Sequence, residues 1–140
     1  MNNTIVKSKL FRSLVQCRNH WAWLAITGSY NKESYKPSQR WPYGCKCCSY
    51  AGATKASKNA DNIAGYRDCS KCPLLGYAWH PYSKYESENL TFIACNRRLA
   101  FYYDWGESRS TSMRSYYAMR IVQACDKAIE DFLVHGRLRP

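Results

Sequence analysis

Four cysteines in two C-x-x-C pairs are the residues of this chain whose types and spacing most clearly indicate chemistry. The pairs are Cys45 with Cys48 and Cys69 with Cys72, and twenty residues separate them. Two thiolates three positions apart can face one metal ion from a tight turn, so two pairs complete the four-thiolate shell that zinc favours. The spacing therefore predicts one structural Zn²⁺ ion. A shell of four thiolates has no open position for water, so we expect this zinc to stabilise the fold and not to hydrolyse a substrate.

Other cysteine and histidine side chains offer alternatives to this ligand set. Cys47 lies inside the first pair, so Cys45 with Cys47 is an alternative to Cys45 with Cys48. His80 could replace one thiolate, and Cys95 could join a metal shell. Two more cysteines lie on or beside apolar helical stripes, where burial as small hydrophobic side chains is the usual role: Cys17 and Cys125.

The positive charge of the chain is concentrated in its first half. The net charge is +11, and residues 1–71 hold twelve Lys and Arg against three Asp and Glu, whereas residues 72–140 hold nine against seven. A field of this sign favours polyanionic partners. Cations near exposed tyrosines could contact phosphates and stack on bases; a solvated basic loop is the alternative. The candidate anion-binding residues are Lys46, Lys55, Lys58, Arg67 and Lys71, with Arg97 and Arg98 as a second group.

Hydrophobic periodicity predicts a long helix near each end of the chain. The first covers residues 4–26, with Asn3 or Thr4 as its cap and Gly28 at its end. Its apolar stripe consists of Leu10, Leu14, Cys17, Trp21 and Leu24. The last helix runs from about Ser110, or Ser112 as the alternative cap, to Val134. Its apolar stripe consists of Met113, Tyr117, Ile121, Ala124, Ala128 and Phe132.

These elements predict a single zinc-stabilised domain over residues 1–140, of a mainly α fold class with little β structure. The long N-terminal and C-terminal helices would pack around a four-cysteine zinc-knuckle module at residues 41–80, and the helical C-terminal part would cover residues 96–135. We expect the tail at residues 137–140 to be mobile. Charges interrupt the apolar positions of the N-terminus, which argues against export and favours a reducing cytoplasm, where such cysteine pairs bind metal more often than they form disulfides or act in redox chemistry.

Several short motifs, in this order, resemble those of a group of small, largely uncharacterised zinc-binding proteins of tailed bacteriophages. They are the segment from His20 to Ala25 (HWAWLA), the C-x-x-C-S-Y-A segment from Cys45, the C-x-x-C-P-L segment from Cys69, the Y-x-x-W segment from Tyr102 and the R-x-x-Y-A-x-x-I segment from Arg114. The resemblance implies a phage origin, a mainly helical fold and a zinc site made by the two cysteine pairs. It implies no particular biochemical activity. Cys47 departs from a plain C-x-x-C pair and is the reason for the alternative ligand register.

The leading hypothesis is a small basic phage accessory protein that binds a polyanionic or nucleoprotein target in the cytoplasm of the infected bacterial host. Host takeover or anti-defence is the expected context, for example inhibition of a CRISPR, restriction or transcription complex, with no membrane partner. The sequence contains no Gly-rich phosphate loop, H-E-x-x-H motif or nucleophile elbow, so we expect a binding protein and not an enzyme. The alternatives are a protein inhibitor that acts through its aromatic surface, a direct DNA- or RNA-binding regulator, and a zinc-dependent nuclease.

Overall fold

The computed structural model describes residues 8–41, 45–50, 72–78 and 101–140, and all its elements there are helical. The α-helices are α2 (Lys9–Thr27), α3 (Lys46–Tyr50), α5 (Phe101–Glu107) and α6 (Thr111–His135), and the 3₁₀ helices are η1 (Lys32–Ser34) and η2 (Lys36–Arg40). The expected mainly helical fold is confirmed. The zinc-knuckle module at 41–80 lies largely outside the described residues, as does the start of the part at 96–135.

Helix α2 begins five residues later than the periodicity predicted. Ser8 has an extended backbone (φ −67°, ψ 150°), and its hydroxyl accepts a hydrogen bond from the Phe11 N–H, so Ser8 is the N-cap. The helix ends where expected, because Gly28 adopts the left-handed conformation (φ 66°) and its N–H donates to the Leu24 carbonyl at 2.8 Å. Only glycine adopts this backbone conformation without strain, which explains the abrupt end.

The expected N-cap of α6 is confirmed at Ser110, and the helix ends at His135, one residue beyond the expected end. The Ser110 hydroxyl accepts from the Met113 N–H, and Gly136 terminates the helix in a left-handed conformation (φ 74°). No helix among the described residues is both long and apolar enough to cross a membrane.

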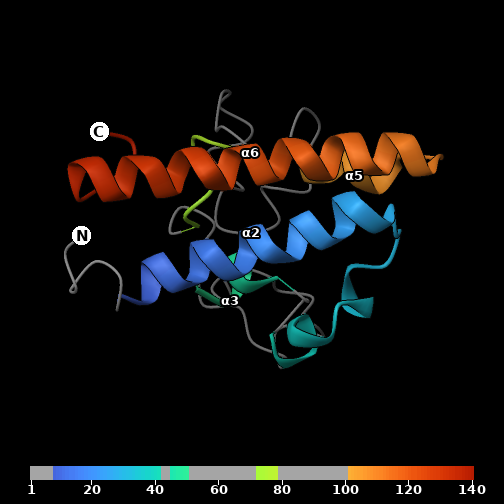
Figure 1. Cartoon of the computed structure of the whole chain (residues 1–140), viewed down its shortest axis with the longest axis horizontal. Helices are drawn as coiled ribbons and strands as arrows, with labels where there is room; N and C mark the ends of the chain where they lie inside the picture. Colours follow the sequence, from blue (N-terminus) through green and yellow to red (C-terminus); the bar gives the residue numbers. More distant parts are fainter. Residues whose placement is uncertain (1–7, 42–44, 51–71, 79–100) are drawn as a thin grey trace, which may run out of the picture.

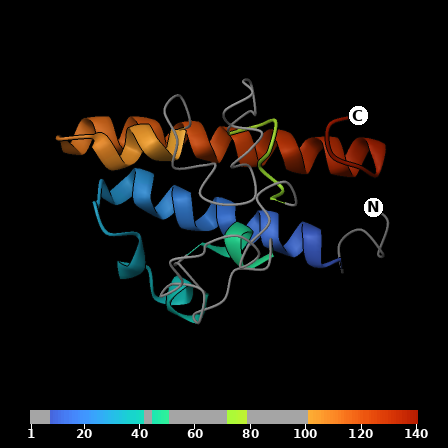
Figure 2. The same ribbon diagram turned by 180° about the vertical axis from the view of Figure 1, so that it is seen from behind.

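Helices α2 and α6 lie side by side and antiparallel, and they form the main layer of the molecule (Figures 1 and 2). The buried face of α2 matches the predicted stripe at Leu14, Cys17, Trp21 and Leu24. On α6 the stripe is confirmed at its centre, but Met113 is 47% exposed and is no part of the core. Small side chains let the two helices approach closely there, and the buried residues of α6 include Ala118, Ile121, Val122, Ala124, Cys125 and Ala128.

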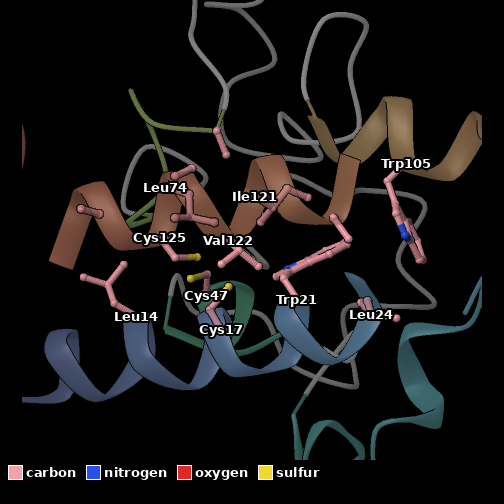
Figure 3. Packing of buried hydrophobic residues seen from close by; sticks show 14 of the residues in the cluster. Leu14, Cys17, Trp21, Leu24, Cys47, Leu74, Trp105, Ile121, Val122 and Cys125 are labelled. Atoms are coloured by element: carbon pink, nitrogen blue, oxygen red, sulfur yellow. The ribbon is translucent and has the colours of Figure 1, made fainter. Parts of the chain in front are cut away.

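Helix α5 closes one end of this core with aromatic rings (Figure 3). The Trp105 ring meets the Trp21 ring edge to face, with 5.2 Å between centroids and an interplanar angle of 88°. The Tyr102 ring packs against the same Trp21 ring at 5.9 Å. Edge-to-face pairs of this kind are favoured by the aromatic quadrupole, so Trp21 is a point at which α5 is joined to α2.

His20 fixes the 3₁₀ segment against α2. Its Nε2 lies 2.7 Å from the Lys32 carbonyl oxygen, which can only accept, so Nε2 carries the proton. The Tyr35 ring stacks on the imidazole with 5.0 Å between centroids. His20 is fully buried. Its Nδ1 has no hydrogen-bond partner among the described residues.

Residues 72–78 are tied to α6 and to the chain terminus through Tyr77. The Tyr77 hydroxyl donates to Asp131 Oδ2 at 2.8 Å and accepts from the Arg139 N–H at 2.6 Å. The Arg139 guanidinium also donates to the Leu75 carbonyl at 2.6 Å. The expectation that residues 137–140 would be mobile is therefore wrong for Arg139, because three of its donated bonds are made to residues 73–77.

Candidate functional site

A groove of about 600 Å³ lies between the first turns of α2 and the short helix α3. Three basic side chains line it: Lys9 and Arg12 from α2, and Lys46 from α3. The other lining residues are polar or aromatic: Ser13, Gln16, Ser49 and Tyr50. Among the residues that the structure describes, no acidic side chain lines the groove and none of its three cations forms an ion pair.

The charge arrangement at this end of α2 is unfavourable for an isolated helix. The N-terminus of a helix carries a partial positive charge and is stabilised by acidic side chains. The first turn of α2 contains no acidic residue, and Lys9 and Arg12 lie there instead. The Ser13 hydroxyl donates to the Lys9 carbonyl at 2.7 Å. It is a neutral group, so it does not compensate the positive charges of Lys9 and Arg12. An anion in the groove would offset the repulsion.

The structure describes only one of the predicted anion-binding residues. Lys46 lines the groove, beside the Ser49 and Tyr50 side chains, and its Nζ lies 5.9 Å from the Trp41 ring centroid. Lys9 and Arg12 were not among the predicted anion-binding residues. The absence of acidic residues from the first helix was the sequence feature that could have indicated them. The other candidates lie outside the described residues: Lys55, Lys58, Arg67, Lys71, Arg97 and Arg98.

A second feature lies in the core between α2, α3 and α6, where cysteine side chains converge. Figure 3 shows the sulfur atoms of Cys17, Cys47 and Cys125 pointing toward one another from these three helices. Cys17 and Cys125 are 0% exposed and Cys47 is 1% exposed. Cys72, from the segment 72–78, is 9% exposed and belongs to the same hydrophobic cluster. We refer to Cys17, Cys45, Cys47, Cys72 and Cys125 as the thiol cluster.

Hydrogen bonds connect the members of the thiol cluster. The bond with Cys125, then those with Cys45 and Cys47, and burial raise the pKa of Cys17 well above its ordinary value. The bonds from Cys17 and Cys72 lower the pKa of Cys47 to about 7, although burial opposes this. At Cys125 the bond from Cys17 lowers the pKa, but burial and neighbouring thiolate charge outweigh it, so the pKa is raised. The Cys47 thiol therefore loses its proton more readily than an ordinary cysteine.

Two of the four predicted zinc ligands can be placed. Cys45 precedes α3 and Cys72 begins the segment 72–78, and each contacts a different member of the thiol cluster, Cys17 and Cys47 respectively. Cys48 lies in α3, but its side chain is outside the described part of the structure, as are Cys69 and the alternative ligands His80 and Cys95. The prediction that Cys45, Cys48, Cys69 and Cys72 bind one zinc ion therefore stays a prediction.

The described thiols are arranged neither as a metal shell nor as disulfides. Among the described residues, no group of three or more His, Cys, Asp or Glu side chains is placed so that it could hold a metal ion. No disulfide joins these five thiols to one another. In chemical terms the cluster is a set of reduced thiols in mutual contact. Thiols in general can lose electrons to an oxidant, or lose their protons to solvent and bind a metal ion as thiolates.

Comparison with protein-family models, with curated proteins and with solved structures found no match to this chain.

Proposed function

We propose that this protein binds the phosphates of a nucleic acid in the groove between α2 and α3. The observation that supports this function is the convergence of Lys9, Arg12 and Lys46 on one groove whose described lining contains no acidic side chain. Cations that face one another across a groove repel, and a bound phosphate chain would relieve that repulsion and release its own counterions. In an infected host cell, such binding would direct a phage accessory protein to a nucleoprotein target.

Tyr50 favours a single strand as the bound form. Its ring is 39% exposed at the edge of the groove, on the same short helix as Lys46. Binding of single strands commonly combines a basic groove with aromatic rings on which bases stack, and one such stack contributes about 1–3 kcal/mol. Duplex DNA keeps its bases stacked on one another, so it could use the three cations but not the tyrosine ring.

A salt titration with matched variants tests the proposal. The full chain is titrated with a fluorescent single-stranded oligonucleotide, and the dissociation constant is measured at several salt concentrations. Each phosphate contact contributes about −0.7 to the slope of log K against log salt for a single strand. The double variant Lys9→Gln with Arg12→Gln should therefore make the slope shallower by about 1.4, and Tyr50→Ala should weaken binding about 5- to 150-fold.

The control variant removes the same charge elsewhere. Arg109 and Arg120 are exposed and lie outside the groove, so Arg109→Gln with Arg120→Gln should leave the slope unchanged. Equal effects of the two double variants would show that net charge, and not the groove, is responsible. Wild-type protein that does not bind single strands or duplex at low salt would contradict the proposed function. Tighter binding of duplex than of single strands would contradict the role given to Tyr50.

A further inference from the structure

A second, smaller pocket of about 320 Å³ lies at the end of the molecule where the first turn of α2 is beside the last turn of α6 (Figures 1 and 2). Its lining combines four segments of the chain, with Leu10 from α2, Tyr50 from α3, Phe132 from α6, and Arg137, Leu138 and Arg139 from the tail. We refer to it as the tail pocket. Its volume lies within the range of about 300–1,000 Å³ that is typical of ligand sites.

The part of the tail that lines this pocket is held in place by specific contacts. The Arg139 guanidinium donates to the Leu75 carbonyl and the Arg139 N–H donates to the Tyr77 hydroxyl, each at 2.6 Å. Arg139 has a φ of 51°, which residues other than glycine adopt only where their surroundings enforce it. A Cβ at Gly76 would lie 2.8 Å from Arg139 Cδ, so a glycine is needed for this close approach. These contacts position the neighbouring Leu138 at the pocket.

Tyr50 connects the tail pocket with the groove between α2 and α3. Among the described lining residues, Tyr50 is the one that the groove and the tail pocket share. The first turn of α2 also borders both, because Lys9 and Arg12 line the groove and Leu10 lines the tail pocket. A strand that passes Tyr50 in the groove therefore comes directly to the tail pocket.

The lining of the tail pocket suits a flat base better than a phosphate. Leu10, Phe132 and Leu138 supply apolar side chains, against which a phosphate would lose water without compensation. A base has apolar faces, and its own phosphate can stay in solvent beside Arg137. Arg137 is exposed, forms no ion pair among the described residues, and has no acidic neighbour in the described lining. Unpaired bases are commonly splayed out of a strand and bound by aromatic rings and guanidinium groups.

We propose that the tail pocket binds one unpaired base of the strand whose phosphates lie in the groove between α2 and α3. The base enters beside Tyr50 and packs its faces against Phe132 and Leu138, while Arg137 attracts its phosphate. This site rests on the proposed function and adds a base-binding position to it. Duplex DNA cannot fill the tail pocket unless a base pair opens, so the pocket gives a second reason for a preference for single strands.

Two single strands with the same number of phosphates test the proposal. One is a fluorescent oligothymidine, and the other is a labelled strand of equal length in which every nucleotide lacks its base. The full chain is titrated with each strand at low salt, and wild-type protein should bind the oligothymidine more tightly. Leu138→Ala should weaken binding of the oligothymidine about 4-fold or more, because each buried methylene group contributes about that factor. It should leave binding of the base-free strand unchanged.

Val134→Ala is the matched control. Val134 is 68% exposed on α6 and is not among the described lining residues of the groove or the tail pocket, so this variant should match the wild type on both strands. Equal weakening of both strands by Leu138→Ala, or no weakening of either, would overturn the base site. Equal affinity of wild-type protein for the two strands would also overturn it, but would leave phosphate binding in the groove intact. Absence of binding to both strands would contradict the proposed function as well.

Photocrosslinking of the wild-type chain applies if Leu138→Ala does not fold, which far-UV circular dichroism checks. The oligothymidine then carries 5-iodouracil in place of thymine, the complex is irradiated, and the crosslinked residues are mapped by mass spectrometry. This base crosslinks preferentially to aromatic side chains that it touches, so both Tyr50 and Phe132 should be labelled. Crosslinks at Tyr50 with none in residues 132–139 would overturn the base site while supporting the groove.

Discussion

The Arg18 Nε of α2 donates to Asp126 Oδ1 of α6 at 2.7 Å. Each of these residues directly follows a cysteine of the thiol cluster, because Arg18 follows Cys17 and Asp126 follows Cys125. The ion pair thus lies at the level of α2 and α6 where the two thiols meet. The two side chains are 40% and 51% exposed, so the ion pair lies at the edge of the core. It shows which turn of α2 faces which turn of α6.

We predict that Asp126→Asn lowers the free energy of unfolding by less than about 1 kcal/mol, because exposed ion pairs contribute little. The loss should shrink at high salt, where the wild-type pair is screened. Urea denaturation at low and high salt measures both effects. Glu130→Gln is the control, since Glu130 is exposed one turn along α6 and forms no ion pair among the described residues. A salt-independent loss above 2 kcal/mol would contradict a surface role.

Gly28→Ala should destabilise the protein through two separable effects. The left-handed backbone of Gly28 costs an alanine about 1–2 kcal/mol. In addition, a Cβ at this position would collide with the Thr111 side chain at the start of α6. In a Thr111→Ser background, which removes the colliding methyl group, only the backbone penalty should remain. A double-mutant cycle from thermal denaturation measures the difference.

Gly106→Ala is the control for this prediction. Gly106 lies within α5 and no atom lies within 4 Å of the Cβ position. Alanine is the better helix former, so this variant should be as stable as wild type or up to about 1 kcal/mol more stable. A similar loss at Gly28 with and without the Thr111 methyl group would show that the collision does not contribute.

Stability should fall between pH 7 and pH 5 because of His20. Burial lowers the pKa of His20 below 6.5, although the hydrogen bond to Lys32 opposes this. The unfolded chain therefore binds the proton more readily, so the contribution of neutral His20 is complete above about pH 6.5 and declines as pH falls toward the folded-state pKa. The slope can reach about 1.4 kcal/mol per pH unit.

Chemical denaturation at several pH values checks this expectation. His20→Gln removes the titrating group, so its stability should vary less with pH in this window than that of the wild type, whatever its absolute stability. His135→Gln is the control, because His135 is exposed at the end of α6. If His20→Gln retained the wild-type slope, another group would be responsible for the pH dependence.

Tyr77→Phe should destabilise the protein at neutral pH and much less in acid. The Tyr77 hydroxyl is the first cause of the lowered pKa of Asp131, followed by the hydrogen bond from Lys127, while burial acts in the opposite direction. A carboxylate with a lowered pKa stabilises the fold above its unfolded pKa, near 4, and that stabilisation is lost as pH falls through the folded-state pKa. The difference between variant and wild type should therefore shrink between pH 7 and pH 3.

Thermal denaturation across this pH range measures the difference. Tyr116→Phe is the matched control, because the Tyr116 side chain is 58% exposed and makes a ring contact with Tyr117. It should follow the wild type at every pH. A Tyr77→Phe deficit that is constant across the range would mean that the loss of the Arg139 N–H bond, and not the Asp131 bond, dominates.

The sequence was sufficient to predict the long helices because their apolar residues repeat with the helical period. Leu14, Trp21 and Leu24 are buried as that period requires. The start of α2 was harder to predict, because Asn3, Thr4 and Ser8 are all good caps and the period continues across them. The extended backbone of Ser8 and its hydrogen bond from the Phe11 N–H identify Ser8 as the cap.

The groove and the thiol cluster could not be predicted because each combines residues that are far apart in the sequence. Lys46 reaches the groove from α3, whereas Lys9 and Arg12 reach it from α2. Cys17 looked like a core residue by its position on an apolar stripe, and it is one. The stripe does not indicate that Cys17 meets the thiol of Cys125 across the core. That contact depends on the register of α2 against α6.

The pairing of α2 with α6 also has a consequence for how the chain is made. The ribosome releases α2 long before Thr111 begins α6, and at about 5–20 residues per second the delay is roughly 4–17 s. During that time Leu14, Trp21 and Leu24 are without the helix that buries them in the finished protein. The nascent chain therefore exposes the apolar face of an amphipathic helix, to which chaperones can bind, until α6 has been synthesised.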